Sequence, residues 1–135
     1  MGFLIDTCIW IDVERGRISP ADVASITGIE PVYLSPVSLA ELAFGADMAS
    51  DETIRQQRHA ALQRLRRKPF CVIDEMTGLI FGRLAAHLRL EGRDHRYRIQ
   101  DLWLASQAIQ NNLKLLTKNR KDFADLPALE LVLFH

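Results

Sequence analysis

Short runs of apolar residues recur along the chain and are separated by longer stretches with a different period. The runs show almost no polar alternation, which is typical of strands buried on both faces of a sheet. The first run ends at Asp6 and the second at Ser35-Pro36. The pattern predicts five strands, at residues 3–5, 32–34, 70–73, 114–117 and 130–134.

Between these runs the apolar residues return at helical spacing, framed by helix start and stop signals. Ser19-Pro20 and Ser35-Pro36 each place an N-cap serine before a proline at the first helical position. Gly28 and Gly92 suit the ends of helices. The predicted helices cover residues 20–28, 36–48, 75–91 and 100–111, and a further one starts from Ser50 as its cap and runs to about residue 68.

Buried strands separated by helices predict an α/β fold. Parallel strands need crossover connections, and helices on both faces keep such a sheet away from water. The expected architecture is a three-layer α/β/α sandwich with a parallel sheet. With 135 residues, 48% of them hydrophobic, the chain fits one domain spanning residues 1–135.

The total charge and the number of cysteines say little about function, but the positions of these residues along the chain are informative. Seventeen basic and seventeen acidic residues cancel, yet the first third is acidic and the later segments are basic. Cys8 and Cys71 have no metal-ligand spacing and are expected to be reduced thiols. No apolar run is long enough to span a membrane, and the start lacks a basic leader, so we expect a cytoplasmic protein.

Three acids fall where an open parallel sheet gathers its functional groups. Asp6 closes the first strand, Glu41 lies in the first turns of the helix after the second strand, and Asp101 begins the helix before the fourth. Two unit charges about 4 Å apart repel by about 4 kcal/mol at an effective dielectric near 20. Protons or a cation must therefore accompany these carboxylates.

The ligand chemistry indicates which cation this is. No histidine or cysteine ligand is expected, and oxygen ligands alone favour Mg²⁺, with Mn²⁺ as a possible substitute. Such an ion lowers the pKa of a bound water for attack on a phosphodiester. Hydrolysis of RNA or DNA is the expected chemistry, with one or two metal ions.

At these acids the chain resembles the PIN-domain family, and within it the bacterial VapC-type toxins. The resemblance covers essentially the whole chain and depends on four segments in the right order. They are FLIDT at residues 3–7, SLAELAFG at 38–45, IQDLWLASQA at 99–108, and LLTKNRKDF at 115–123, which Leu126-Pro127 follows.

The resemblance implies a fold, an activity and partners. It implies a sheet order of 3-2-1-4-5, which would bring Asp6, Glu41 and Asp101 together as metal ligands and catalytic residues. It also implies a metal-dependent endoribonuclease that forms a homodimer and is restrained by a small VapB-like antitoxin. Operator DNA would be contacted only through that antitoxin.

The same resemblance assigns supporting residues. Thr7 and Thr117 match positions where the family places hydroxyls beside the acids. Many relatives carry a fourth acid where Asn119 stands, so either Asn119 or Asp122 is a candidate to take over that role.

Other residues receive weaker interpretations from the sequence. Arg93, Arg96 and Arg98 precede Asp101 and could grip RNA phosphates, and Trp10 is expected at an interface. Several acids without motif support are expected to be surface or helix-capping groups, namely Asp12, Glu14, Asp74, Glu75 and Asp94.

Two other classes of function also place an aspartate after the first strand. A haloacid-dehalogenase-type phosphatase needs a second aspartate where Cys8 stands, and a receiver domain needs an acidic pair before its first helix, which is missing. A non-catalytic PIN-like module that binds RNA or acts as a scaffold remains the alternative, favoured only by Asn119.

Overall fold

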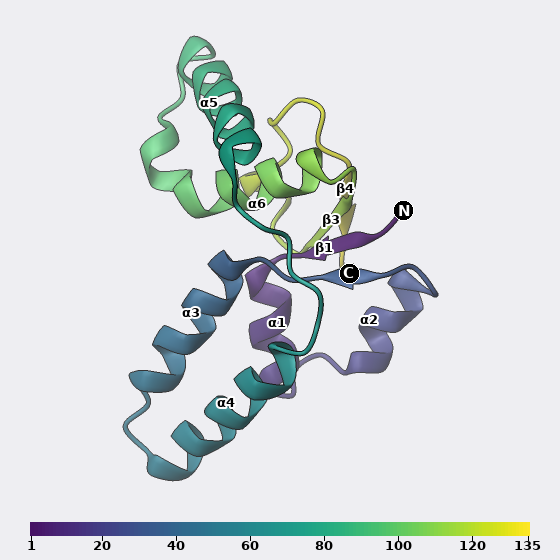
Figure 1. Ribbon diagram of the computed structural model, residues 1–135, viewed down its shortest axis with the longest axis vertical. Helices are drawn as coiled ribbons and strands as arrows, with labels where there is room; N and C mark the ends of the chain where they lie inside the picture. Colours follow the sequence, from purple (N-terminus) through teal and green to yellow (C-terminus); the bar gives the residue numbers. More distant parts are fainter.

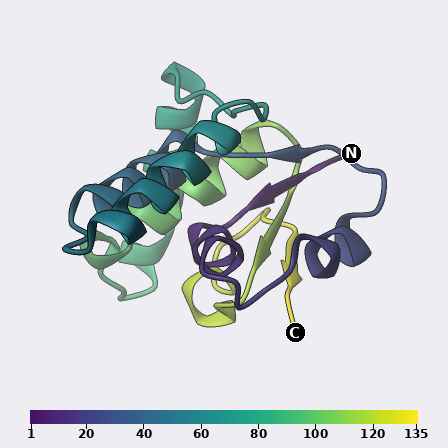
Figure 2. The ribbon, with the colours of Figure 1, turned by 90° about the horizontal axis from the view of Figure 1, so that it is seen from below.

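The computed structural model describes all residues from 1 to 135. One parallel sheet has the strand order β2-β1-β3-β4, from β1 (Phe3–Ile5), β2 (Val32–Tyr33), β3 (Lys114–Thr117) and β4 (Leu131–Leu133). In Figure 2, β1, β3 and β4 point their arrowheads in the same direction. Because the strands are parallel, the residues that follow them meet at one edge of the sheet.

Helices cover both faces of this sheet, so the predicted three-layer α/β/α architecture is confirmed. On one face lie α5 (Glu75–Leu90) and α6 (Ile99–Gln110); on the other lie α1 (Thr7–Glu14), α2 (Pro20–Thr27), α3 (Pro36–Asp47) and α4 (Glu52–Leu65) (Figure 1). Two short 3₁₀ helices, η1 (His95–Arg98) and η2 (Arg120–Asp122), complete the chain. No helix combines the length and apolarity needed to cross a membrane.

The strands contribute side chains to two apolar cores, one on each face of the sheet. Leu4 packs with buried residues of α5 and α6, whereas its neighbours Phe3 and Ile5 pack with those of α1, α3 and α4. This division follows from the pleat, which sends successive side chains to opposite faces. Burial on both faces explains why the strands lack polar alternation in sequence.

The predicted third strand, at residues 70–73, is wrong in extent. Only a single parallel bridge joins Phe70 to Leu34, with the Cys71 amide donating to the Leu34 carbonyl at 2.8 Å. The neighbouring strand cannot extend the ladder, because Ser35 already caps α3. Val72 and Ile73 therefore remain exposed. The other four strands follow the implied order, with this edge strand reduced to a bridge.

The helix start signals are confirmed at two serines and wrong at a third. Ser19 forms a reciprocal capping box with Asp22, and the Ser35 hydroxyl accepts from the Val37 amide at 3.0 Å. The cap of α4 is Asp51, not Ser50, because the carboxylate reaches two amides of the first turn. Helix α1 was not predicted. Its apolar residues follow closely on those of β1, so the change from strand to helical spacing is not visible in the sequence.

Candidate active site

Three separate elements bring the predicted acids to the C-terminal edge of the sheet. Asp6 follows β1 at the start of α1, Glu41 lies on α3, and Asp101 lies in the first turn of α6. The negative charges of Asp6 and Glu41 both raise the pKa of Asp101, and the charge of Asp6 also raises the pKa of Glu41. The structure therefore places all three carboxylates near enough for their charges to interact, in a region that we call the acidic pocket. Asp122 of η2 also lies nearby, since its negative charge raises the pKa of both Asp6 and Asp101.

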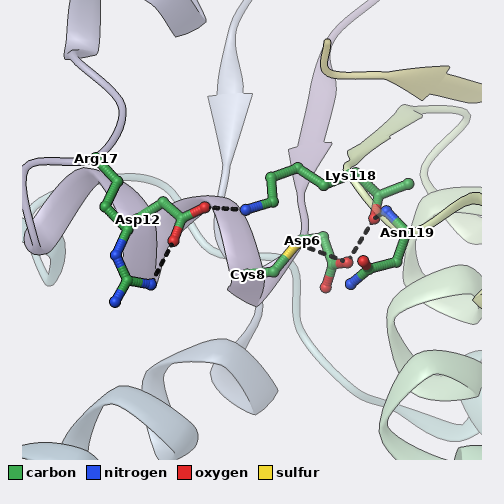
Figure 3. A network of polar contacts seen from close by, with 7 residues as sticks. Asp6, Cys8, Asp12, Arg17, Lys118 and Asn119 are labelled. Atoms are coloured by element: carbon green, nitrogen blue, oxygen red, sulfur yellow. Dashed lines mark hydrogen bonds and ion pairs between the residues drawn. The ribbon is translucent and has the colours of Figure 1, made fainter.

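Asp6 is the most deeply buried of these acids, with 5% of its surface exposed. The Thr117 hydroxyl donates to Asp6 Oδ2 at 2.7 Å. The Cys8 thiol approaches the same oxygen at 3.4 Å (Figure 3). Burial raises the pKa of Asp6 above its ordinary value, and these hydrogen bonds oppose the rise. Both side-chain contacts engage Oδ2, whereas Oδ1 receives no side-chain hydrogen bond.

Asp101 and Glu41 are partly exposed, and their environments also disfavour the charged form. Burial, followed by the charges of Asp122 and Asp6, raises the pKa of Asp101 to about 7. Burial and then the charge of Asp6 raise the pKa of Glu41. Shifts in one direction at neighbouring acids mark a pocket with uncompensated negative charge, which is typical of functional sites.

The predicted hydroxyl residues fix the backbone around Asp6. Thr117 is fully buried, and its oxygen also accepts the Asn119 amide at 3.0 Å. The side-chain amide of Asn119 points toward Asp6 (Figure 3). Thr7 bonds instead to the hydroxyl of Ser38, at 2.7 Å, and so ties the start of α1 to α3.

A buried polar link that sequence analysis missed joins the helices that carry Glu41 and Asp101. The Ser35 hydroxyl, which also caps α3, donates to Gln107 Oε1 of α6 at 2.5 Å. Gln107 Nε2 in turn donates to the Cys71 carbonyl at 2.8 Å. Both side chains are fully buried, so this link sets the position of α3 relative to α6.

The sequence profile of the PIN domain matches residues 3–129. This chain belongs to the PIN-domain family. A Ribonuclease VapC from Rickettsia bellii is 32% identical over 98% of this chain and 96% of the relative. Ribonuclease VapC5 from Mycobacterium tuberculosis is 36% identical over 91% of this chain and 86% of the relative.

Solved structures share the same PIN fold over the full chain. VapBC2 from Rickettsia felis, bound to a DNA fragment from its promoter, gives a TM-score of 0.85 at 23% identity and covers 100% of both chains. VapBC-5 from Mycobacterium tuberculosis gives 0.74 at 29% identity and covers 100% of this chain and 99% of the other. This PIN domain is thus of the VapC type.

The three arginines predicted to bind RNA are all engaged in ion pairs within this PIN domain. Arg98 makes two hydrogen bonds to Asp125, at 2.7 and 2.8 Å, and Arg93 reaches the same carboxylate at 2.6 Å. Arg96 pairs with Asp94 at 2.7 Å. Arg98 also donates to the Asp122 carbonyl at 2.5 Å and so holds η2 beside α6. Contact with RNA stays a prediction for all three.

Among the acids outside the PIN motifs, the expectation for Asp12 is wrong. Asp74 and Asp94 are helix caps as predicted, and Glu75 is exposed. Asp12 is instead buried, and its carboxylate pairs with Lys118 and Arg17 (Figure 3). Nothing local in the sequence signals this pair, because Lys118 lies 106 residues away.

The donor set of the acidic pocket fits a hard cation. Its oxygens come from carboxylates and from the Asn119 amide, and the raised pKa values of Asp6 and Asp101 identify negative charge that a cation would neutralise. No three acidic, imidazole or thiol side chains lie close enough together to hold a metal ion by themselves. Mg²⁺ does not need three such side chains, because it keeps several waters and commonly binds one or two carboxylates directly.

Proposed function

We propose that this chain is a Mg²⁺-dependent endoribonuclease and the toxin component of a type II toxin–antitoxin module. The observation that carries the proposal is the proximity of Asp6, Glu41 and Asp101 beyond the same ends of the strands, where burial and, after it, repulsion from neighbouring acids raise the pKa of each. The relatives named ribonucleases support RNA as the substrate.

Each residue of the pocket has a defined part in this proposal. Asp6 and Asp101 would hold Mg²⁺, or Mn²⁺ in its place, directly, and Glu41 would bind it directly or through water. A bound ion of this kind supplies a water of lowered pKa and stabilises charge on a phosphodiester. Thr117 orients the Asp6 carboxylate through its hydrogen bond to Oδ2. Asn119 is a candidate to bind the ion through its carbonyl or to hold a metal-bound water, and Asp122 is a candidate to replace the family's fourth acid.

The test is cleavage of single-stranded RNA by the purified chain, with mapping of the new RNA ends. We expect EDTA to abolish cleavage and added Mg²⁺ to restore it, because the carboxylates cannot position a nucleophilic water alone. Cleavage that survives chelation would contradict the metal mechanism. RNA binding without any cleavage would favour the alternative, a non-catalytic PIN-like module.

We further infer that a VapB-like antitoxin restrains the nuclease, since the structural neighbours are VapBC assemblies. The chain offers a groove of about 680 Å³ among α1, α2 and α4. Trp10 lines it with a buried indole N–H that has no hydrogen-bond partner. The homodimer, and DNA contact only through the antitoxin, also stay predictions.

Charge on the rim of this groove predicts the chemistry of the antitoxin segment. Arg64, Arg67 and Lys68 line the groove, and none of them forms an ion pair within the chain. An apolar segment flanked by acidic residues would complement this rim.

Reversing charge at the rim should therefore weaken binding of the antitoxin. We expect the double change Arg64→Glu and Lys68→Glu to raise the dissociation constant of the co-expressed VapB-like protein at least ~10-fold, mainly at low salt. RNA cleavage by the free toxin should not change. Arg83→Glu, a charge reversal on the exposed face of α5, is the control. An equal effect of both changes on the dissociation constant would argue against the groove.

A further inference from the structure

A charged network along α1 lies next to the acidic pocket and has no part in the function proposed above. The carboxylate of Asp12, with 7% of its side chain exposed, is shared by the ammonium of Lys118 and by Arg17 at 3.4 Å. Two cations and one carboxylate leave one positive charge. In Figure 3 the Lys118 side chain starts beside the Asp6 site and directs its ammonium toward Asp12.

The backbone on both sides of Lys118 is fixed to the acidic pocket. Thr117, the residue before it, donates to Asp6, and the amide of Asn119, the residue after it, donates to Thr117. Lys118 therefore starts from a turn that cannot move without disturbing Asp6. Its side chain nevertheless keeps 39% of its surface exposed, so its ammonium can meet a ligand from solvent.

We propose that Lys118 contacts the substrate, with Asp12 holding its ammonium beside the acidic pocket, where it binds a backbone phosphate next to the scissile one. This inference rests on the proposed ribonuclease function. Four carboxylates surround the pocket, and a polyanion approaching them needs cations nearby beyond the metal. The arginines before α6 are attached to another element, whereas Lys118 extends from the strand end that contacts Asp6.

The pairing of Asp12 allows Lys118 to change partners. A lysine has a flexible stem and a compact charge, so its ammonium can turn from a carboxylate to a phosphate. Asp12 would not be left as an unpaired buried charge, because Arg17 remains beside it at 3.4 Å. Asp12 is then a positioning residue and Lys118 a substrate-binding one.

A purely structural role would have a different signature. In that case the Asp12–Lys118 pair would only fasten the end of β3 to α1, and its loss would lower the melting temperature without changing the dependence of RNA binding on salt. Contact with one phosphate instead predicts that removal of the Lys118 charge lowers the slope of log K against log salt by about 0.7 for single-stranded RNA.

The experiment compares Lys118→Met with Lys114→Met. Lys114 lies at the other end of the same strand and pairs with Glu30 at 3.6 Å, so it is a matched control for loss of an ion-paired lysine. Binding of a fluorescein-labelled single-stranded RNA of mixed sequence is measured by anisotropy over a salt series without Mg²⁺. For Lys118→Met we expect affinity to fall about 5- to 10-fold at low salt and the slope to decrease; for Lys114→Met we expect neither change.

Further variants separate the possible outcomes. Lys118→Arg should restore most of the affinity because it keeps the charge. Lys118→Gln, which can still donate to Asp12, replaces the Met variant if that one does not fold. Equal salt slopes for wild type and the neutral variant would overturn the inference even if wild type cleaves RNA. Absence of Mg²⁺-dependent cleavage by wild type would overturn the proposed function, while the salt slopes would still decide the role of Lys118.

Discussion

Replacing Asp6 with asparagine is expected to lower the rate of RNA cleavage by at least ~10³-fold, because a metal ion contributes several kcal/mol to stabilising a phosphoryl transition state. Asp6 is the buried centre of the pocket, and its charge acts on both Glu41 and Asp101. Asparagine keeps the shape of the side chain and one oxygen but removes the negative charge. The measurement is the initial rate with saturating Mg²⁺, together with growth of cells that express the variant.

The fold should survive this substitution. Asp6 is the N-cap residue of α1 but makes no side-chain capping bond there, and Asn119 and Thr117 remain in place to contact the new amide. Asp51→Asn is the matched control, because it makes the same chemical change at the N-cap of α4, far from the pocket, and asparagine caps well. Full activity of Asp6→Asn, with a normal circular dichroism spectrum, would contradict the assigned metal site.

Replacing Asp101 with asparagine should abolish cleavage and yet stabilise the metal-free protein. Burial and the charges of Asp122 and Asp6 outweigh the attraction of Arg98, so ionised Asp101 destabilises the fold. Removing that charge should raise the free energy of unfolding by about 2 kcal/mol at pH 8. The full pKa shift would correspond to more, but the partly exposed carboxyl is also screened by solvent. Thermal unfolding in EDTA should show a rise of roughly 5 °C.

The pH dependence has a definite sign. The pKa of Asp101 is raised from 3.8 to about 7, so between these two values the folded chain holds a proton that the unfolded chain has lost. The contribution of Asp101 to the free energy of unfolding of the wild type is therefore fully present below about pH 4 and is lost as the pH rises through 7. The advantage of Asp101→Asn should be absent at pH 4, grow through pH 6 and level off by pH 8.

Mg²⁺ should reverse the order of stability. It is expected to raise the melting temperature of wild type, because binding to the folded state alone stabilises it, and to raise that of Asp101→Asn much less. A variant that is no more stable than wild type at pH 8 in EDTA would mean that the acids do not strain the pocket. In that case no cation would be required to relieve it.

The sequence by itself determined the order of the elements, most of their ends and the identity of the acids. Neighbouring residues encode these features: buried runs give strands, and Ser19 and Ser35 followed by proline start helices in both places. Asp6, Glu41 and Asp101 were predicted because each lies at the end of a strand or in the first turns of a helix. Recognising the family motifs then related these acids to one another across the chain.

Only the tertiary structure decided the contacts between residues that the sequence keeps apart. Asp12 was expected at the surface. It is instead buried and forms an ion pair with Lys118, which lies 106 positions away in the sequence. Ser35 and Gln107 meet across 72 positions, and the strand at 70–73 shrinks to one bridge because Ser35 leaves it no partner. Such contacts depend on how the helices pack over the sheet. The spacing of apolar residues along the chain does not determine which helix faces which.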